Sequence, residues 1–281
     1  MKLSIPLFCI LIGWAVSAVS NAGDNPLNVQ LVAENVAIQP GHAFRVGLHL
    51  QHPAGYHSYW KFAGIVGIPT GIEWKLPPGW TAGEIEWPAP ERVLMFQIKA
   101  QGFYDEKLLP IMLTPPKDLV PGRTVKLEGT ARWMCCGRNC NPGFKNVSVE
   151  LPVQADAPAP DSRWSELFEK SLSSGAKYSN DWTARAEITN QNVIFHILPV
   201  SAAAREQMSR IRDVKFFTED GLTDPNRPES LTRSETELLF TQGVSEFAPD
   251  PLPKEVRGIL QSAEGWLPGE SSIRISAPLH R

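Results

Sequence analysis

Short alternating segments, separated by prolines and glycines, constrain the fold of this chain more than any other feature. The 281 residues include 25 prolines and 21 glycines. Between them polar and apolar residues alternate, most clearly over residues 27–32 and 44–50, and a period of two is typical of strands with one buried face. Further strands are predicted at residues 71–76, 93–100, 108–113, 124–134 and 145–153. About seven strands in about 130 residues predict an all-β fold that begins with an immunoglobulin-like β-sandwich.

A change of composition divides the chain. Residues 154–160 are rich in proline and alanine and lack periodicity, so we predict a linker there. Residues 161–173 then place Trp164, Leu167 and Phe168 on one face of a helix. Strands are predicted again at residues 182–188, 193–198, 213–218, 237–242 and 272–277, with a turn at residues 190–192. We therefore expect a first domain at residues 23–153 and a second, smaller β domain with a short helix at residues 161–281.

The N-terminus predicts export. Lys2 precedes an apolar run over residues 3–19, and residues 20–22 supply the small side chains that signal peptidase accepts. We interpret residues 1–22 as a cleaved signal peptide and expect a periplasmic or secreted protein. The alternative is an uncleaved anchor, for which the run is somewhat short. No later apolar run reaches about eighteen residues, so we expect no membrane span in the mature chain.

Charge and composition limit the partners. The net charge is −3 and becomes more negative once Lys2 is removed, and no basic stripe is present, so nucleic acids and anionic membrane surfaces are poor candidates. The content of 42% hydrophobic residues with nine tryptophans is sufficient for a real core. We therefore expect a folded protein whose partners are neither nucleic acids nor anionic membrane surfaces.

The cysteines that remain after export all lie within residues 135–140. Cys136 and Cys140 are separated by Gly137, Arg138 and Asn139, and glycine and asparagine tolerate the positive φ of a tight reversal. Such a reversal would allow a disulfide. The closed loop is short, so the bond would stabilise the fold only weakly, and a redox role is favoured. Arg138 would favour the thiolate form of a neighbouring cysteine.

Two other interpretations of the cysteines remain open. Cys136 and Cys140 could form an inert structural disulfide in a non-catalytic binding module, since exported proteins use such bridges. Alternatively, Cys135, Cys136 and Cys140 could bind Cu(I) through three thiolates. Successive residues of a regular strand point to opposite faces, so we expect Cys135 to face away from Cys136 as a small buried hydrophobic residue.

Several motifs resemble one known family. They are GYHSYW at residues 55–60, IEWKLPPGW at 72–80, GEIEWPAP at 83–90, WMCC at 133–136 and CNP at 140–142. Together they resemble the N-terminal periplasmic domain of the thiol:disulfide interchange protein DsbD, and the copper-tolerance branch called ScsB is the more similar. Residues 216–225 and 257–260 extend the resemblance into the second domain.

The resemblance implies a function and a set of site residues. Family members take two electrons from a membrane-embedded donor through a thioredoxin-like module and pass them to oxidised substrate proteins outside the cytoplasm, without a cofactor or metal. Cys136 and Cys140 match the redox pair, with Cys140 as the attacking cysteine. Trp87 matches an aromatic residue of a cap loop that shields the sulfurs, and Tyr59 and Tyr104 match tyrosines near them.

The chain also departs from the family pattern. Full-length relatives carry a membrane domain and a thioredoxin-like domain after this region, and neither follows here, so we expect separate proteins to supply the electrons. Residues 62–67 are more apolar than the family pattern, and Cys135 is an additional cysteine. These departures bear on the identity of the partners more than on the fold.

Overall fold

The computed structural model describes residues 25–280, which are built mostly of strands. The predicted signal peptide lies outside these residues. The first part contains β1 (Asn28–Ala33), β2 (Phe44–Gln51), β3 (Ser58–Tyr59), β4 (Gly71–Lys75), β5 (Thr81–Ile85), β6 (Glu91–Met95), β7 (Ile98–Phe103), β8 (Glu106–Thr114), β9 (Thr124–Cys136) and β10 (Cys140–Pro152). The remainder contains α1 (Ser165–Ser173), β11 (Lys177–Tyr178), β12 (Trp182–Thr189), β13 (Asn192–Pro199), α2 (Ala202–Met208), β14 (Lys215–Thr218), β15 (Glu229–Arg233), β16 (Leu238–Gly243), β17 (Glu255–Gln261) and β18 (Ser272–His280).

The first part is an immunoglobulin-like sandwich, as the alternation predicts. One sheet has the order β1-β2-β8-β5 and the other the order β10-β9-β4. Along β9, buried side chains alternate with exposed ones, and Leu127, Ala131 and Trp133 enter the main core with residues of the facing sheet such as Leu48 and Ile111. The alternation therefore reflects one buried face on each sheet.

A small third sheet, of order β3-β7-β6, lies at one end of this sandwich. Its β6 and β7 form a hairpin in which Met95 pairs with Ile98. The prediction of a single strand over residues 93–100 was therefore wrong. Phe96 sits at the turn with φ 57°, in the left-handed region that phenylalanine rarely adopts. The sequence offers no glycine, asparagine or aspartate at this point, so nothing signalled the reversal.

The second part is one large sheet with its own core. The order β14-β17-β18-β12-β13-β16-β15 is extended by β11, which pairs with β18 in parallel. Phe195, Phe216, Phe240 and Trp266 are among the buried side chains of its core. The predicted turn before β13 is present, because Asn190 and Gln191 both have positive φ. Five strands and one helix were not predicted from the sequence: β3, β5, β11, β15, β17 and α2.

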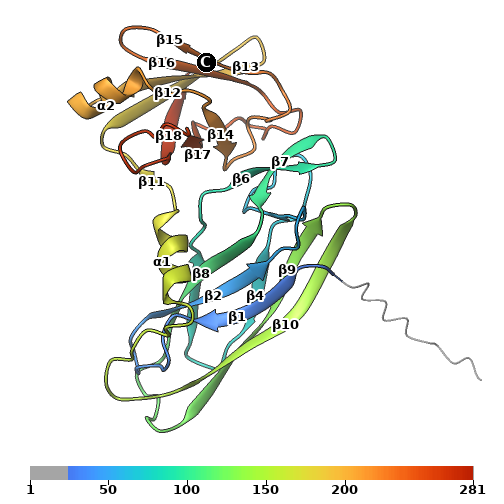
Figure 1. Cartoon of the computed structure of the whole chain (residues 1–281), viewed down its shortest axis with the longest axis vertical. Helices are drawn as coiled ribbons and strands as arrows, with labels where there is room; N and C mark the ends of the chain where they lie inside the picture. The colour runs from blue at the N-terminus through green and yellow to red at the C-terminus, as the bar shows by residue number, and fades with distance from the viewer. Residues whose placement is uncertain (1–24, 281) are drawn as a thin grey trace, which may run out of the picture.

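Helix α1 lies against the first sandwich rather than the second sheet. Phe168 is buried in a cluster with Val32 and Leu108, and Ser171 Oγ donates a hydrogen bond of 2.7 Å to the carbonyl of Leu108. In Figure 1 the helix runs along the sandwich and leads into the second part. We propose that the division between the two parts follows α1, later than residues 154–160.

Nothing in residues 25–280 forms a helix with the length and apolar character needed to cross a membrane.

Candidate functional site

Strands β9 and β10 form the long hairpin that carries the cysteines. They pair residue by residue from Thr124 opposite Pro152 to Cys136 opposite Cys140. Cys136 and Cys140 form a disulfide, with their Cα atoms 4.1 Å apart. The disulfide therefore closes the tip of a hairpin whose two strands are already joined along thirteen paired positions.

The reversal between the cysteines is made differently from the sequence prediction. Neither Gly137 nor Asn139 has a positive φ, and Gly137 N donates a hydrogen bond of 3.0 Å to Asn139 O. A Cβ atom at Gly137 would lie 2.7 Å from Cδ1 of Tyr56. Glycine is therefore needed for the close approach of the Tyr56 ring, and not for a left-handed backbone.

The two sulfurs differ in exposure. Cys136 is completely buried, with 0% relative exposure, whereas Cys140 is half-buried and Arg138 between them is exposed. An incoming thiol or disulfide can therefore approach Cys140 more easily than Cys136.

An apolar cover packs over the disulfide. Tyr59, Ala63, Val93 and Ala100 are buried in one cluster with Cys136. Val66, Met95, Tyr104, Met134 and Cys140 pack against this cluster. Most of these side chains come from two segments: residues 59–66, which begin at the last residue of β3, and residues 91–104, which hold the β6–β7 hairpin and the residue after it. We call these two segments the cysteine cover.

His57 was not predicted as a site residue, yet it lies directly beside Cys136. The two residues exchange both backbone hydrogen bonds, with His57 N to Cys136 O at 2.8 Å and Cys136 N to His57 O at 2.9 Å. Directly opposed residues place their side chains on the same face of a sheet. The His57 ring is 3.3 Å from the Tyr59 hydroxyl and contacts the rings of Tyr59 and Tyr104 edge-on. The sequence signal that could have pointed to His57 as a site residue was its position two residues before Tyr59 in the same motif.

The surroundings keep these groups uncharged. Burial, followed by the proximity of His52, lowers the pKa of His57 to about 4. Burial is also the main cause that raises the pKa of Tyr59 to about 12. At neutral pH Cys136 therefore lies beside the neutral imidazole of His57 and the neutral phenol of Tyr59.

Part of this chain is similar to a known protein family. Residues 28–152 match the family model described as thiol:disulfide interchange protein DsbD, N-terminal. Over these residues the chain is similar to the N-terminal region of DsbD. The match covers the sandwich, the cysteine hairpin and the cover. The family and the disulfide together indicate a thiol-disulfide exchange module.

A solved structure shows the same fold over nearly the whole chain. It is the N-terminal periplasmic domain of ScsB from Proteus mirabilis, with a TM-score of 0.65 and 16% identity, covering 92% of this chain and 95% of that one. A protein of unknown function from Porphyromonas gingivalis W83 covers 91% of this chain and 100% of its own at 12% identity, but its TM-score of 0.22 supports no argument. No curated protein matches the chain.

The two tyrosines and the tryptophan that the DsbD resemblance singled out lie in different surroundings. Tyr59 and Tyr104 both pack beside the disulfide, and the Tyr104 hydroxyl accepts a hydrogen bond from Leu94 N in the cover. Trp87 instead stacks on Phe103, with ring centroids 6.3 Å apart, and packs against the main sandwich core. This position does not fit the shielding role implied for Trp87. The β6–β7 hairpin, which the sequence did not predict, provides the shield.

Cys135 lies on the other face of β9, as the strand alternation predicts. Its side chain is fully buried in the main core, apart from the cluster that holds Cys136. Burial raises the pKa of its thiol to about 12, so the reactive thiolate is scarce at neutral pH. The three sulfurs are not gathered on one face. Within residues 25–280 no group of three histidine, cysteine, aspartate or glutamate side chains is placed to hold a metal ion.

Arg138 is at the exposed tip of the hairpin. Among the described residues it forms no ion pair, although it lies in the loop closed by the disulfide. Its guanidinium is therefore available to an approaching thiolate or partner, and its predicted effect on the cysteines stays a prediction.

Proposed function

We propose that this chain is an extracytoplasmic dithiol carrier, which transfers two electrons between a thioredoxin-like partner and the disulfides of substrate proteins. The observation that supports this most directly is the difference between its two cysteines. Cys140 is partly exposed, whereas Cys136 is buried beside it under an apolar cover. The Cys140 sulfur is thus accessible to a partner protein, whereas the Cys136 sulfur is protected.

The reaction follows from this arrangement. In the reduced state, the Cys140 thiolate attacks one sulfur of a substrate disulfide, and the other substrate sulfur leaves as a thiolate that takes up a proton. Cys136, once deprotonated, attacks Sγ of Cys140 in the mixed disulfide, and the second substrate sulfur leaves as a thiol. Two electrons have then passed to the substrate, and the Cys136–Cys140 disulfide has formed again. A dithiol of the thioredoxin-like partner reduces it by the reverse exchange and is itself oxidised.

A structural role for the disulfide is less well supported. The hairpin is held by a continuous ladder of backbone hydrogen bonds below the cysteines, and the disulfide joins residues only four positions apart. A bridge that closes so short a loop restricts the unfolded chain little. The non-catalytic binding module remains an alternative that the trapping experiment below tests, whereas the three sulfurs of the Cu(I) alternative are divided between two clusters.

A trapping experiment tests the proposed roles. The Cys136→Ser variant lacks the resolving sulfur, so mixed disulfides between Cys140 and partner proteins should accumulate in periplasmic extracts. The Cys140→Ser variant is the matched control, because its remaining sulfur is buried, and it should accumulate far fewer. An absence of mixed disulfides in both variants, together with a reduction potential well below about −300 mV, would show an inert bridge.

We propose that the thioredoxin-like partner docks on apolar side chains next to the disulfide. Leu94 and Phe96 on the β6–β7 hairpin and Phe144 on β10 are large hydrophobic residues with high exposure. Phe96→Ser should slow disulfide exchange with a thioredoxin-like protein while reduction by dithiothreitol stays unchanged. Phe247, 73% exposed in the second part against 69% for Phe96, provides the control variant Phe247→Ser.

The export of the chain and a role in copper tolerance are further proposals from the sequence. N-terminal sequencing of the protein from the periplasm should begin at residue 23. Deletion of the gene should increase copper sensitivity, and the Cys140→Ser variant should fail to restore tolerance.

A further inference from the structure

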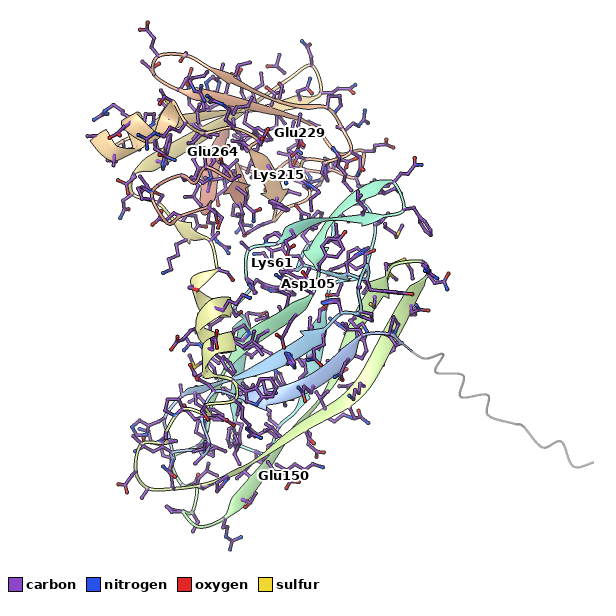
Figure 2. All side chains as sticks on the ribbon, in the orientation of Figure 1. Lys61, Asp105, Glu150, Lys215, Glu229 and Glu264 are labelled. Atoms are coloured by element: carbon purple, nitrogen blue, oxygen red, sulfur yellow. A yellow bond between two sulfur atoms is a disulfide. The ribbon has the colours of Figure 1, made fainter. Side chains whose placement is uncertain are left out.

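The cysteine cover lies between the disulfide and the second part of the chain. Val93 and Ala100 contact the cluster around Cys136 on one side. Figure 1 shows the β6–β7 hairpin reaching towards β14 and β17 of the second sheet, and in Figure 2 Lys61 lies at the end of the sandwich that faces this sheet. Both segments of the cover are therefore placed to contact it.

Side chains of the second part hold the backbone of the β6–β7 hairpin. The Asn226 side chain accepts a hydrogen bond of 2.7 Å from Lys99 N and donates one of 3.0 Å to Lys99 O. One amide thus satisfies both polar backbone groups of a β7 residue, as a neighbouring strand would. At the start of the hairpin, Gln261 Nε2 donates a hydrogen bond of 2.8 Å to Pro90 O.

Two side chains of the cover, Gln101 and Arg92, donate hydrogen bonds to the second part. Gln101, with 0% exposure, donates from Nε2 to Phe62 O at 2.7 Å and to Thr218 O at 2.9 Å. It therefore joins both segments of the cover to β14. Arg92 donates to Phe216 O at 3.1 Å, and its guanidinium lies 4.7 Å from the centre of the Phe217 ring.

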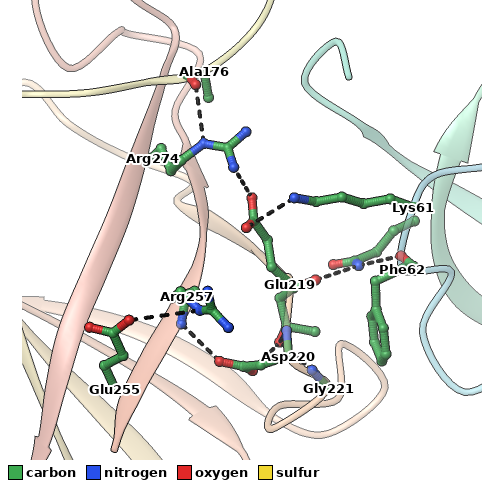
Figure 3. A network of polar contacts seen from close by, with 11 residues as sticks. Lys61, Phe62, Ala176, Glu219, Asp220, Gly221, Glu255, Arg257 and Arg274 are labelled. Atoms are coloured by element: carbon green, nitrogen blue, oxygen red, sulfur yellow. Dashed lines mark hydrogen bonds and ion pairs between the residues drawn. The ribbon is translucent and has the colours of Figure 1, made fainter. Parts of the chain in front are cut away.

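The other segment of the cover is held by an ionic network (Figure 3). Lys61 Nζ is 3.0 Å from Glu219, and the same carboxylate is 2.6 Å from Arg274. Beside this network, the Phe62 ring packs so closely on Gly221 that a Cβ there would lie 2.7 Å from Cζ of the ring. Gly221 also has a φ of 77°, so both its backbone and its surroundings require glycine.

From these contacts we infer that the second part has a positioning role in the exchange reaction: it holds the cysteine cover closed over the disulfide. This inference rests on the proposed function and concerns how access to the sulfurs is limited. The contacts that join the two are both polar and apolar: Phe217 and Ile259 of the second part are buried in one cluster with Trp60 and Phe103 of the cover segments. Arg92 Nη1 and Gln101 Oε1 are buried there without a hydrogen-bond partner. A segment of a protein can open at a lower free energy than global unfolding requires, so weakening these contacts should let the cover open locally.

The double variant Asn226→Ala with Gln261→Ala tests the inference in the full chain. Both side chains belong to the second part, and they bond to backbone groups of Lys99 in the cover and of Pro90 directly before it. Removing these three hydrogen bonds should increase the rate of disulfide reduction by dithiothreitol about tenfold. Gln207→Ala is the matched control, because Gln207 donates to the carbonyls of Glu264 and Gly265 within the second part, and it should leave the rate within about twofold.

Hydrogen exchange provides a second measurement that does not depend on redox activity. In the double variant, amides of residues 59–66 and 91–104 should exchange faster, whereas those of β9 below the cysteines should not. Unchanged exchange in the cover would overturn the inference, and so would faster exchange with an unchanged rate of reduction. The two proposals can also fail separately. If the cover opens in the double variant and dithiothreitol reduces the disulfide faster, the inference stands. If the disulfide then still exchanges with no partner protein, the proposed function is refuted.

Discussion

Acid should destabilise the fold through His57. This imidazole is 1% exposed, and its pKa is lowered from 6.5 to about 4 in the folded protein, mainly by burial. The unfolded chain therefore binds a proton between pH 6.5 and pH 4 that the folded chain does not bind, and the free energy of unfolding must fall as the pH falls through this window. Each pH unit of difference corresponds to about 1.36 kcal/mol. By pH 4.5 the loss from His57 should reach about 2.5 kcal/mol relative to pH 7.5.

Urea unfolding followed by circular dichroism, for the wild type and for His57→Gln, measures this contribution. The variant should lose about 2.5 kcal/mol less than the wild type between pH 7.5 and pH 4.5. His52, whose pKa is also lowered by burial, is present in both proteins and cancels in the comparison. Equal losses in the two proteins would refute the reasoning, as would an NMR titration in which the His57 ring of the folded protein takes up its proton near pH 6.5.

Three further predictions concern packing near the disulfide. Cys135 should resist iodoacetamide in the folded protein at pH 7 and react only on unfolding, and labelling of the native protein would contradict its burial. Gly137→Ala should cost about 1–3 kcal/mol of stability through its contact with Tyr56, as measured by urea unfolding. Gly83→Ala, where the nearest contact would be 3.5 Å, should cost less, and equal costs would contradict the steric argument. Trp87→Ala should cost about 3–5 kcal/mol, yet leave the rate of disulfide reduction by dithiothreitol unchanged. A faster rate would restore the shielding role for Trp87.

Much of the site could be predicted because its signals are local. Cys136 and Cys140 are close in sequence, so their pairing depends on one short reversal. The alternation along β9 also predicted that Cys135 would be buried and would face away from Cys136, and the two residues lie in different clusters. Local backbone geometry is enough for both conclusions.

The shield over the disulfide could not be predicted in the same way. Phe96 reverses the chain without any residue that favours a turn, and its left-handed backbone is imposed by the pairing of β6 with β7. Trp87 lies in a motif that suggested a shield, but its ring stacks on Phe103 in the sandwich core. The backbone pairing of His57 with Cys136 joins residues 79 positions apart, and no short motif specifies such a contact.

The sequence by itself determined the all-β class, most strands of the sandwich and the position of the paired cysteines, because strand period and turn composition act over a few residues. Only the tertiary structure decided what surrounds those sulfurs. Gln101 and Thr218 meet across 117 positions, and Arg92 and Phe216 across 124. Contacts at such separations depend on how two finished β structures pack, and that packing is a property of the assembled surfaces rather than of any segment.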